Sequence, residues 1–535
     1  MKKFLNTHKI ILLAAALFTA LYNTAFFSQV LNAYPLPKNL MFVISLALVL
    51  FCIIGLLLTL LCHRRTTKII LPILFFIAAL AAYYMDTFNV VIDKTMLINA
   101  AQTNAKEAGD LLTAKLLMYI AFLGVLPSYV FHRLLKVSAP KRTLMQAIGQ
   151  KTILIVLFLS IAMANIVGLS SHYSSFFREF KSIRFYANPI TPIYSSMQFL
   201  FKGKKIAPKD AAPLGKDANI PASDVHRELI VIVVGETARW DRFSLNGYGK
   251  LTNPLLAQEK VVSFKNFTSC GTSTAVSVPC MFSPFGRKDY SDAKFDASEN
   301  LIDVLGHADV SVLWRDNNSD SKGVAVRPEN VTYEDYKDPK NNTVCDIECR
   351  DEGMLVGLQD YIDQHPSGDV TIVLHQMGSH GPAYYKRYPA AFEQFKPACQ
   401  NTQLNQCSDE EISNAYDNTI LYTDYFLSKV IGLLKTNAPK FESAMFYMGD
   451  HGESLGENGV YLHGMPYAFA PEAQTHVGAV VWLSDNFDEI SFDKLKAAEQ
   501  QPFSQDNLFH TVLGMMEIET KVYDANKDIF KLTNK

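Results

Sequence analysis

Long apolar runs dominate the first 170 residues of the chain, and none of these runs contains Asp, Glu, Lys or Arg. There are five of them: Ile10–Phe27, Leu40–Leu61, Ile69–Tyr84, Leu116–Phe131 and Ile153–Leu169. A helix needs about 20 apolar residues to cross the ~30 Å of hydrocarbon in a membrane, and most of the runs approach that length. Five successive buried helices of a soluble protein would show polar faces, which these runs lack. The pattern predicts five membrane-spanning helices.

The first run has a second interpretation, as the apolar core of a cleavable signal peptide. Leu31-Asn32-Ala33 could serve as the cleavage site. The run is longer than the ~7–15 residues usual for such a core, so we expect a retained anchor.

The charges in the loops predict the orientation of the spans. Cations lie before the first span, after the second, and around the link between the fourth and fifth: Lys2, Lys3, Lys9, Arg64, Arg65, Lys68, Arg133, Lys136, Lys141, Arg142 and Lys151. By the positive-inside rule the N-terminus is cytoplasmic. With five spans, everything after Leu169 then lies outside the cytoplasm.

The C-terminal part alternates short apolar strands with helical segments. The predicted strands are Leu229–Val234, Val310–Trp314, Val370–Leu374 and Ala444–Met448, and the predicted helices include Asn300–His307, Met354–His365 and Ile412–Lys435. Continuous apolar strands separated by helices indicate a mostly parallel sheet with helices on both faces. We therefore predict an α/β domain over residues 228–535. Its ligands should bind beyond the carboxyl ends of the strands.

Residues 171–227 connect this domain to the predicted bundle of residues 1–170. His172–Lys205 places aromatic residues between Arg and Lys side chains, which is typical of a segment at a membrane interface. An amphipathic helix packed on the soluble domain explains the same pattern. Gly203–Asp224, with its Lys, Pro and Ala content, is predicted to be a flexible tether.

Charge and cysteine content narrow the function classes. The formal net charge of the 535 residues is −2, which gives no sign of a nucleic-acid partner. Two cysteines, Cys52 and Cys62, lie at the second span, and the other six form close pairs in the C-terminal part: Cys270/Cys280, Cys345/Cys349 and Cys399/Cys407. Such pairs in an exported domain predict three disulfides that staple loops. A zinc cluster is the alternative, but its CxxC spacing does not occur in the sequence.

Potential metal ligands follow three of the predicted strands. The segments after them are Gly235-Glu236-Thr237-Ala238-Arg239, His375-Gln-Met-Gly-Ser-His380 and Gly449-Asp450-His451-Gly452-Glu453. Glu, Asp and His bind zinc or manganese in proteins. A single Asp-His after a strand is usually a turn or a helix cap. Three strand ends that carry such groups together predict a metal site at this edge of the sheet.

A hydroxyl-rich loop follows the first strand, with the sequence Cys270-Gly-Thr-Ser-Thr274-Ala-Val-Ser-Val-Pro-Cys280. Any one hydroxyl in such a loop usually serves only to keep the loop soluble. A divalent cation beside one of them would lower the pKa of that oxygen and make it nucleophilic.

The order of these motifs resembles that of a known family. Five spans are followed by Gly-Glu-Thr-Ala-Arg, then by the Cys270–Cys280 loop, then by Gly-Asp-His-Gly-Glu-Ser-Leu-Gly-Glu-Asn-Gly from Gly449. This is similar to the lipid A phosphoethanolamine transferases of Gram-negative bacteria, which include the plasmid-borne polymyxin (colistin) resistance enzymes. The likeness covers essentially the whole chain. It implies that the C-terminal domain has the alkaline phosphatase/sulfatase fold.

The resemblance also implies roles for individual residues. It implies a zinc site with four ligands, which are Glu236, Thr274, Asp450 and His451, with Thr274 as the nucleophile. It points to two histidines that hold a second metal or the substrate, which are His380 and His463. It further implies three residues that hold the phosphoethanolamine group, which are Asn318, Ser319 and Lys322.

A polar stretch before the fourth span adds a further expectation. Asn99, Thr103 and Glu107 recur every four residues, so a helix would place them on one face. A solvated helix face is the alternative. With the family pattern, we expect these residues to line the path of a lipid headgroup.

The implied reaction transfers phosphoethanolamine from phosphatidylethanolamine to a phosphate of lipid A through a threonine intermediate. Masking the negative charge of lipid A would weaken the binding of polymyxin and other cationic peptides. We expect a monomer in the bacterial inner membrane with a periplasmic catalytic domain. The alternatives are a transferase of phosphoglycerol or phosphoethanolamine to another lipid or glycan, a hydrolase of the same superfamily, and a catalytically dead scaffold. Ser277-Val278-Pro279 resembles the start of a sulfatase motif, but Met281 stands where that motif needs Arg.

Overall fold

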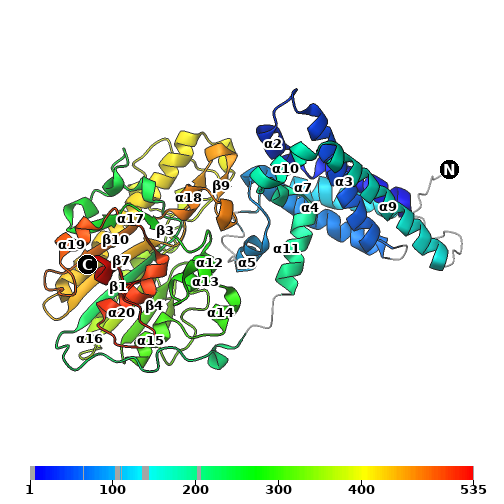
Figure 1. The fold of residues 1–535 in the computed structure, drawn as a ribbon. Helices are drawn as coiled ribbons and strands as arrows, with labels where there is room; N and C mark the ends of the chain where they lie inside the picture. Colours follow the sequence, from blue (N-terminus) through cyan, green and yellow to red (C-terminus); the bar gives the residue numbers. More distant parts are fainter. Residues whose placement is uncertain are drawn as a thin grey trace. The chain divides into compact units, whose positions relative to one another are not determined.

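The chain folds into two compact units, which are described separately. The computed structural model describes residues 7–63, 66–102, 109, 111–134, 144–201 and 206–533 (Figure 1). The helical unit comprises Met1–Leu97 and Leu111–Lys202, and the sheet unit comprises Ile98–Asp110 and Gly203–Lys535. By these contacts residues 171–202 group with the helices, and the predicted division at residues 170 and 227 stays a prediction.

The helices of the first unit follow the predicted apolar runs. They are α1 (Thr7–Leu21), α2 (Thr24–Ala33), α3 (Leu40–Leu61), α4 (Thr67–Phe88), α7 (Ala114–Tyr119), α8 (Leu126–Leu134), α9 (Leu144–Gly168), α10 (Ser170–Glu179) and α11 (Ile190–Leu200). A π-helical turn, Ile120–Val125, joins α7 to α8, and α5 (Lys94–Gln102) contains the point where the division between the units falls. Among the described residues, four helices are long and apolar enough to cross a membrane: Leu40–Leu61, Thr67–Phe88, Ala114–Leu134 and Ile148–Gly168. The predicted number of five is reached if α1 and α2 count as one bent span.

The first apolar run is not the single straight helix that its composition predicts. It bends by 57° between α1 and α2, at Asn23. The buried amide of Asn23 donates to the carbonyls of Phe18 and Asn188, and its oxygen accepts from the backbone of Asn188. Because a buried backbone carbonyl without a partner is costly in an apolar medium, this side-chain pairing allows the helix to break.

The segment after the last long helix packs on the helical unit. Asn188 also donates to the carbonyls of Tyr22 and Ala78, in α1–α2 and α4. In α10, the Tyr173 hydroxyl lies 2.9 Å from the Ser45 hydroxyl of α3, and Phe176 contacts the Phe42 ring. These residues therefore pack within the helical unit, and the alternative of a helix packed on the soluble domain is not tested by these contacts. The interfacial location stays a prediction.

The sheet unit contains one seven-stranded sheet in the order β2-β10-β7-β1-β6-β4-β5. Its strands are β1 (Glu228–Gly235), β2 (Val261–Phe264), β4 (Ser311–Asp316), β5 (Thr332–Asp335), β6 (Val370–His375), β7 (Glu442–Gly449) and β10 (Ala479–Leu483). Short pairs join β3 (Phe267–Thr268) to β11 (Phe503–Ser504) and β8 (Ser454–Leu455) to β9 (Tyr461–Leu462). Pairing is parallel from β7 through β1, β6 and β4 to β5, and β10 is antiparallel to both neighbours. The predicted mostly parallel sheet flanked by helices is confirmed.

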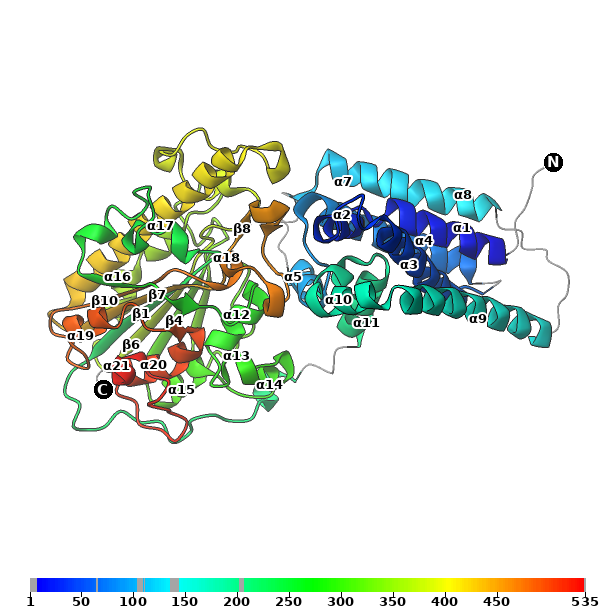
Figure 2. The same cartoon turned by 45° about the horizontal axis from the view of Figure 1, so that its top comes forward.

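Helices cover both faces of this sheet (Figure 2). They are α12 (Thr274–Met281), α13 (Gly286–Asp289), α14 (Asp292–Asp296), α15 (Leu301–His307), α16 (Leu358–Asp363), α17 (Asp409–Asn437), α18 (Glu472–Thr475), α19 (Phe492–Ala497), α20 (Leu508–Met515) and α21 (Ile529–Thr533). Alternate residues of β1 enter opposite cores: Ile230 and Ile232 face α15 and α20, whereas Val231 and Val233 face α16 and α17. Because both faces of the sheet are buried, the sequence of β1 between its ends is one continuous apolar run.

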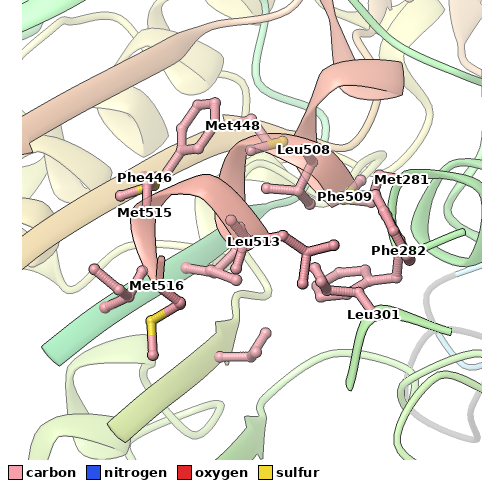
Figure 3. Close-up of a cluster of buried hydrophobic side chains, with 14 of the residues drawn as sticks. Met281, Phe282, Leu301, Phe446, Met448, Leu508, Phe509, Leu513, Met515 and Met516 are labelled. Carbon is pink, nitrogen blue, oxygen red and sulfur yellow. The ribbon is translucent and has the colours of Figure 1, made fainter. Parts of the chain in front are cut away.

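The core on the α20 side is closely filled by large side chains. Figure 3 shows Leu508, Phe509 and Leu513 of α20 among residues of β7 and α12. Met448 at the end of β7 belongs to this cluster, so the packing under α20 supports the strand that leads to Asp450.

The predicted flexible tether is wrong from residue 206 onward, because this segment binds along the sheet unit. Ala212 exchanges backbone hydrogen bonds with Ala297 and Glu299, and Asn219 exchanges two with Glu519. Ala218 is buried in the α20-side core. The Lys, Pro and Ala content correctly indicates that this segment forms no α-helix or β-strand. It does not reveal that the backbone of the segment forms hydrogen bonds with distant parts of the sheet unit.

Removal of one buried leucine should measure how far α20 contributes to stability. Leu513→Ala leaves a cavity among fully buried neighbours and should lower the free energy of unfolding of the sheet unit by about 2–5 kcal/mol. Urea unfolding of the purified chain, followed by tryptophan fluorescence, measures this change. Leu251→Ala is the matched control, because Leu251 is 63% exposed and should change it by less than about 0.5 kcal/mol. Equal effects of the two substitutions would contradict the assignment of α20 to the core.

Candidate active site

The candidate site lies where parallel strands end. Gly235 and Gly449 are paired in register at the ends of β1 and β7, so the residues that follow them, Glu236 and Asp450, emerge next to each other. His451 follows Asp450 directly. All three side chains are completely buried, and their ligand atoms lie within 4.8 Å of one another. The sheet register therefore brings two of the predicted strand ends together in one group of metal-binding atoms.

The spacing of these atoms fits one tetrahedral ion. The Nε2 atom of His451 lies 3.3 Å from Glu236 Oε1 and 3.4 Å from Asp450 Oδ2. The hydroxyl of Thr274 lies 3.0 Å from Glu236 Oε2 and 3.4 Å from His451 Nε2. Ligands held at about 2.0–2.1 Å from a tetrahedral zinc ion are about 3.3 Å apart. These four distances among the residues predicted as zinc ligands fit such an ion.

The hydrogen bonds around the group leave its inward-facing atoms available. Asp450 Oδ1 accepts from the backbone of Thr237 and His451, whereas Asp450 Oδ2 and Glu236 Oε1 have no hydrogen-bond partner in the described part of the chain. His451 Nδ1 donates to the carbonyl of Gly452, which leaves Nε2 as the ligand atom. Buried carboxylate oxygens without partners are costly, so this arrangement calls for a cation between them.

The electrostatics of the site lead to the same requirement. Burial, together with Glu236, raises the pKa of Asp450. Burial would also raise the pKa of Glu236, but His451, whose Nε2 lies 3.3 Å from Glu236 Oε1, brings it below its usual value. Burial lowers the pKa of His451, and Asp450 and Glu236 outweigh this and raise it to about 10. The two carboxylates thus favour positive charge at His451, and a divalent cation held by the same atoms would supply that positive charge instead.

Thr274 is held at the first turn of a helix. It is the first residue of α12, where the helix dipole favours negative charge on a nearby oxygen. The disulfide between Cys270 and Cys280 closes the segment on both sides of it. The other predicted disulfides, Cys345–Cys349 and Cys399–Cys407, are also present. From its composition alone, the Cys270–Cys280 loop would be interpreted as a soluble surface loop. In the structure it holds the buried hydroxyl of Thr274 in a fixed position.

Both predicted accessory histidines lie beside this group. The ring of His463 lies 4.3 Å from that of His451 and 5.8 Å from that of His380, measured between centroids. Glu453 Oε2 lies 3.3 Å from His463 Nδ1. The loops after β6, β7 and β9 thus converge on one place. Their assignment to a second metal or to the substrate stays a prediction.

The three residues predicted to hold phosphoethanolamine have different positions. Asn318 is 1% exposed, and its amide donates to Glu236 Oε2 at 2.7 Å and to the carbonyl of Gln376. Asn318 therefore supports a ligand of the group directly. Ser319 is partly buried and Lys322 donates to its carbonyl at 2.6 Å. Asn99 lies on α5, while Thr103 and Glu107 lie outside the described residues, so the predicted shared face stays a prediction.

Two buried residues that sequence reasoning missed hold the loops of the site together. Gln505 accepts from the backbone of Cys270 and donates to the carbonyls of Gly449 and Asp450, so it joins the Thr274 loop to the Asp450 loop. Asp351 accepts from the backbone of Met377 and Gly378 in the loop after β6. Neither residue belongs to a motif, because each acts through main-chain contacts distant in sequence.

A buried Asp–His pair lies at the ends of β4 and β6. His375 Nδ1 lies 2.8 Å from Asp316 Oδ2, and Trp314 donates to the same oxygen. Burial raises the pKa of Asp316, but His375 and Lys337 bring it below its usual value. The pair fixes the two strand ends between which Asn318 and Gln376 meet.

Two glycines allow the loops to approach the metal-binding group closely. A Cβ atom on Gly452 would lie 2.0 Å from the carbonyl oxygen of Ala473. A Cβ on Gly378, which has a φ of +49°, would lie 2.9 Å from the backbone of Glu236. Any side chain at these positions would displace His451 or Glu236.

Comparison with known proteins finds relatives that match essentially the whole chain. Residues 228–518 match the Sulfatase family, and residues 50–202 match the family described as Phosphoethanolamine transferase EptA/EptB. Phosphoethanolamine transferase EptA of Escherichia coli K12 is 38% identical over 547 residues, which cover 99% of this chain and 98% of that protein. The chain belongs to the phosphoethanolamine transferase family. Its sheet unit belongs to the alkaline phosphatase/sulfatase superfamily.

Further members of the family agree in sequence and in structure. Phosphatidylethanolamine transferase Mcr-1 of Escherichia coli is 46% identical over 480 residues, which cover 88% of each chain. The integral membrane protein lipooligosaccharide phosphoethanolamine transferase A (EptA) of Neisseria meningitidis superposes with a TM-score of 0.91 at 34% identity, over 98% of both chains. The family likeness thus includes the apolar helices as well as the sheet unit.

The Cys270–Cys280 disulfide should matter for activity more than for folding. Replacing both cysteines by serine should slow phosphoethanolamine transfer by roughly tenfold or more, because it loosens the segment that positions Thr274. The matched control replaces Cys399 and Cys407, which close a loop at the start of α17, and should retain most activity. Transfer rates of the two double variants, measured on protein with wild-type thermal unfolding, provide the comparison. Equal losses would show that the first disulfide has no special role.

Proposed function

We propose that the protein transfers phosphoethanolamine from phosphatidylethanolamine to a phosphate group of lipid A, with Thr274 as a covalent carrier. The observation that supports this most directly is the placement of the Thr274 hydroxyl 3.0–3.4 Å from two buried metal-binding side chains at the start of a helix. Membership of the phosphoethanolamine transferase family supplies the transferred group. Relatives at 31% and 33% identity named Kdo(2)-lipid A phosphoethanolamine 7''-transferase support lipid A as the acceptor.

Zinc is the ion that best suits the donor set. Two carboxylates, one imidazole and one hydroxyl favour a borderline cation over Ca²⁺ or Mg²⁺, which prefer oxygen ligands alone. Glu236, Asp450, His451 and Thr274 would hold it. When bound, zinc lowers the pKa of a hydroxyl and stabilises negative charge on phosphoryl oxygens. His380 and His463 are placed to hold a second ion or to contact the substrate.

In the first step Thr274 Oγ1 attacks the phosphorus of phosphatidylethanolamine. A P–O bond to Oγ1 forms and the P–O bond to the glycerol oxygen breaks, so that diacylglycerol leaves with a proton. Glu236 Oε2, 3.0 Å from Oγ1, can accept the proton that the threonine loses and pass it to the departing glycerol oxygen. The N-terminus of α12 favours the negative charge that develops at the phosphoryl group.

In the second step a phosphate oxygen of lipid A attacks the same phosphorus. Its new P–O bond replaces the bond to Thr274 Oγ1, and Oγ1 takes up the proton that the attacking phosphate group loses. Two displacements at one nucleophile constitute ping-pong chemistry. His463 lies beside His451, and His380 lies beside His463, so both can orient the incoming phosphate. The added ethanolamine amine compensates negative charge on lipid A, which should reduce susceptibility to polymyxin.

The expected location follows from the same chemistry and the loop charges. We infer that the helical unit lies in the bacterial inner membrane with the N-terminus in the cytoplasm, and that the sheet unit lies in the periplasm. Three disulfides in the sheet unit support an oxidising compartment. We expect a monomer that binds membrane lipids and no nucleic acid.

Substitution of Thr274 tests the proposed function. Expression of the wild-type chain should add the mass of phosphoethanolamine to lipid A and lower polymyxin susceptibility. Thr274→Ala should abolish both while the protein still folds, and Thr274→Ser should retain part of the activity because it keeps a hydroxyl. Mass spectrometry of lipid A from matched cells measures the modification. Modified lipid A in cells that express only Thr274→Ala would refute the mechanism.

The carrier role can be separated from simple loss of the metal. Incubation of the wild-type enzyme with phosphatidylethanolamine and no acceptor should leave phosphoethanolamine on the peptide that contains Thr274. Asp450→Asn should lose both the adduct and bound zinc, whereas Thr274→Ala should lose the adduct and keep most of the zinc. An adduct on Ser277 would show that Ser277, and not Thr274, is the nucleophile. Release of free phosphoethanolamine as the main product would favour a hydrolase.

A reporter fusion tests the proposed orientation. An alkaline phosphatase reporter placed after Lys535 should be active, because that enzyme needs the oxidising periplasm, and a cytoplasmic reporter at the same position should be inactive. The same two reporters placed before Met1 should show the reverse pattern. A cytoplasmic signal from the C-terminal fusion would overturn the proposed location of the sheet unit.

A further inference from the structure

A second group of carboxylates lies at the opposite end of the central strand from the candidate active site. Glu228 begins β1, Asp369 directly precedes β6, and Asp224 precedes β1 by four residues. One oxygen from each of these three residues lies within 4.8 Å of the others. β1 separates Glu228 from Glu236 by eight residues, which is about 26 Å of extended chain. The group is therefore independent of the catalytic machinery.

Glu228 is the residue that makes this group unusual. It is 1% exposed, and neither of its carboxylate oxygens has a hydrogen-bond partner in the region that the structure describes. The Oδ2 atom of Asp224 is buried without a partner as well. Asp369 uses Oδ1 to accept from the backbone of Glu228, which fixes the two carboxylates side by side. A buried carboxylate directed at two others is strongly destabilising unless a cation or a proton compensates its charge.

The neighbouring cation, Arg227, acts on Asp369 and Glu228 through its charge, but its hydrogen bonds go to backbone carbonyls. Arg227 donates its guanidinium hydrogens to the carbonyls of His365 and Gly368. Further acidic side chains add to the negative potential: Glu442, Asp488, Glu489 and Glu517. Burial, reinforced by Asp369 and Asp224, raises the pKa of Glu228 to about 10. Burial and the neighbouring carboxylates therefore oppose ionisation of Glu228, and a divalent cation within the group would remove that opposition.

We propose that Asp224, Glu228 and Asp369 form a structural binding site for a divalent cation that prefers oxygen ligands, of which Ca²⁺ is the representative. The three side chains offer carboxylate oxygens and no nitrogen or sulfur, which distinguishes this set from the candidate zinc group with its histidine. Carboxylates with spare oxygens can bind Ca²⁺ in monodentate or bidentate form, and backbone carbonyls or water complete its shell.

The adjacent group of His226, Glu442 and Asp488 is a poorer candidate. His226 Nδ1 already lies 2.9 Å from Glu442 Oε1, so the partner of that carboxylate is present. His226 and Asp488 are 55% and 66% exposed, and water can solvate them. A cation is thus needed at Glu228 and not at Glu442.

The proposed ion would fasten the entry of the chain into the sheet unit. Asp224 belongs to the segment that arrives from the helical unit, whereas Glu228 and Asp369 mark the starts of two paired parallel strands. Binding the three together fixes this segment to the base of the sheet. The ion should therefore change stability and leave the chemistry of Thr274 unaltered.

Calcium binding to the full-length, zinc-loaded chain in detergent tests the proposal. Equilibrium dialysis with ⁴⁵Ca²⁺ should detect one bound ion that Glu228→Gln removes. A hundredfold excess of Ca²⁺ over its Kd should raise the thermal unfolding midpoint of the wild type by roughly 5 °C and leave that of Glu228→Gln unchanged. Without Ca²⁺ the variant should be at least as stable as the wild type, because it removes a buried charge. A variant that is at least as stable as the wild type without Ca²⁺ is folded, so its lack of a Ca²⁺ response cannot result from misfolding.

Glu442→Gln is the matched control, since it changes a neighbouring, 4% exposed carboxylate that the proposal leaves out. It should bind ⁴⁵Ca²⁺ as the wild type does. Loss of the ion in Glu442→Gln but not in Glu228→Gln would overturn the assignment. So would a wild type that shows no Ca²⁺ response and instead loses stability as the pH rises, because Glu228 and Asp369 would then share a proton. Phosphoethanolamine transfer at saturating zinc should be equal in all three proteins at a temperature well below unfolding.

Discussion

The parallel pairing of β1 with β7 places two carboxylates side by side in the interior, and the candidate active site is organised around that repulsion. Glu236 and Asp450 follow paired glycines at the strand ends, so their proximity is fixed by the sheet register. Backbone amides and Asn318 satisfy the outer oxygens, while His451 faces the inner ones. The remaining charge favours a bound cation, and the proposed function assigns to such a cation the activation of the hydroxyl beside it.

The two ends of β1 carry different groups of charged side chains. At its carboxyl end, carboxylates are mixed with imidazole and hydroxyl groups that can bind an ion and react. At its beginning, only carboxylates converge. The interior of β1 between them is entirely apolar and buried, which insulates one end from the other. The proposed catalysis and the proposed cation site can therefore lie at opposite ends of the same strands without affecting each other.

Sequence alone predicted the parallel sheet, the strand ends that carry Glu236, Asp450 and His451, and the three cysteine pairs. These succeed because each depends on local pattern: an apolar run, a ligand directly after it, or two cysteines close in the chain. The bend at Asn23, the bound segment after residue 206 and the role of Gln505 could not be predicted. Each depends on main-chain groups more than fifty residues away, and residue composition carries no information about such partners.

The contacts of Gly378 and Gly452 have a consequence for how such a protein can diversify. Because even a methyl group at either position would collide with neighbouring backbone, substitution of these two glycines cannot reshape the surroundings of Glu236 and His451 without displacing them. Ser319, Lys322 and His463 are only partly buried, so changes in acceptor preference can arise there at less cost to the fold. A compound that binds against the backbone of Gly378 and Gly452 would therefore contact positions that substitution cannot readily alter.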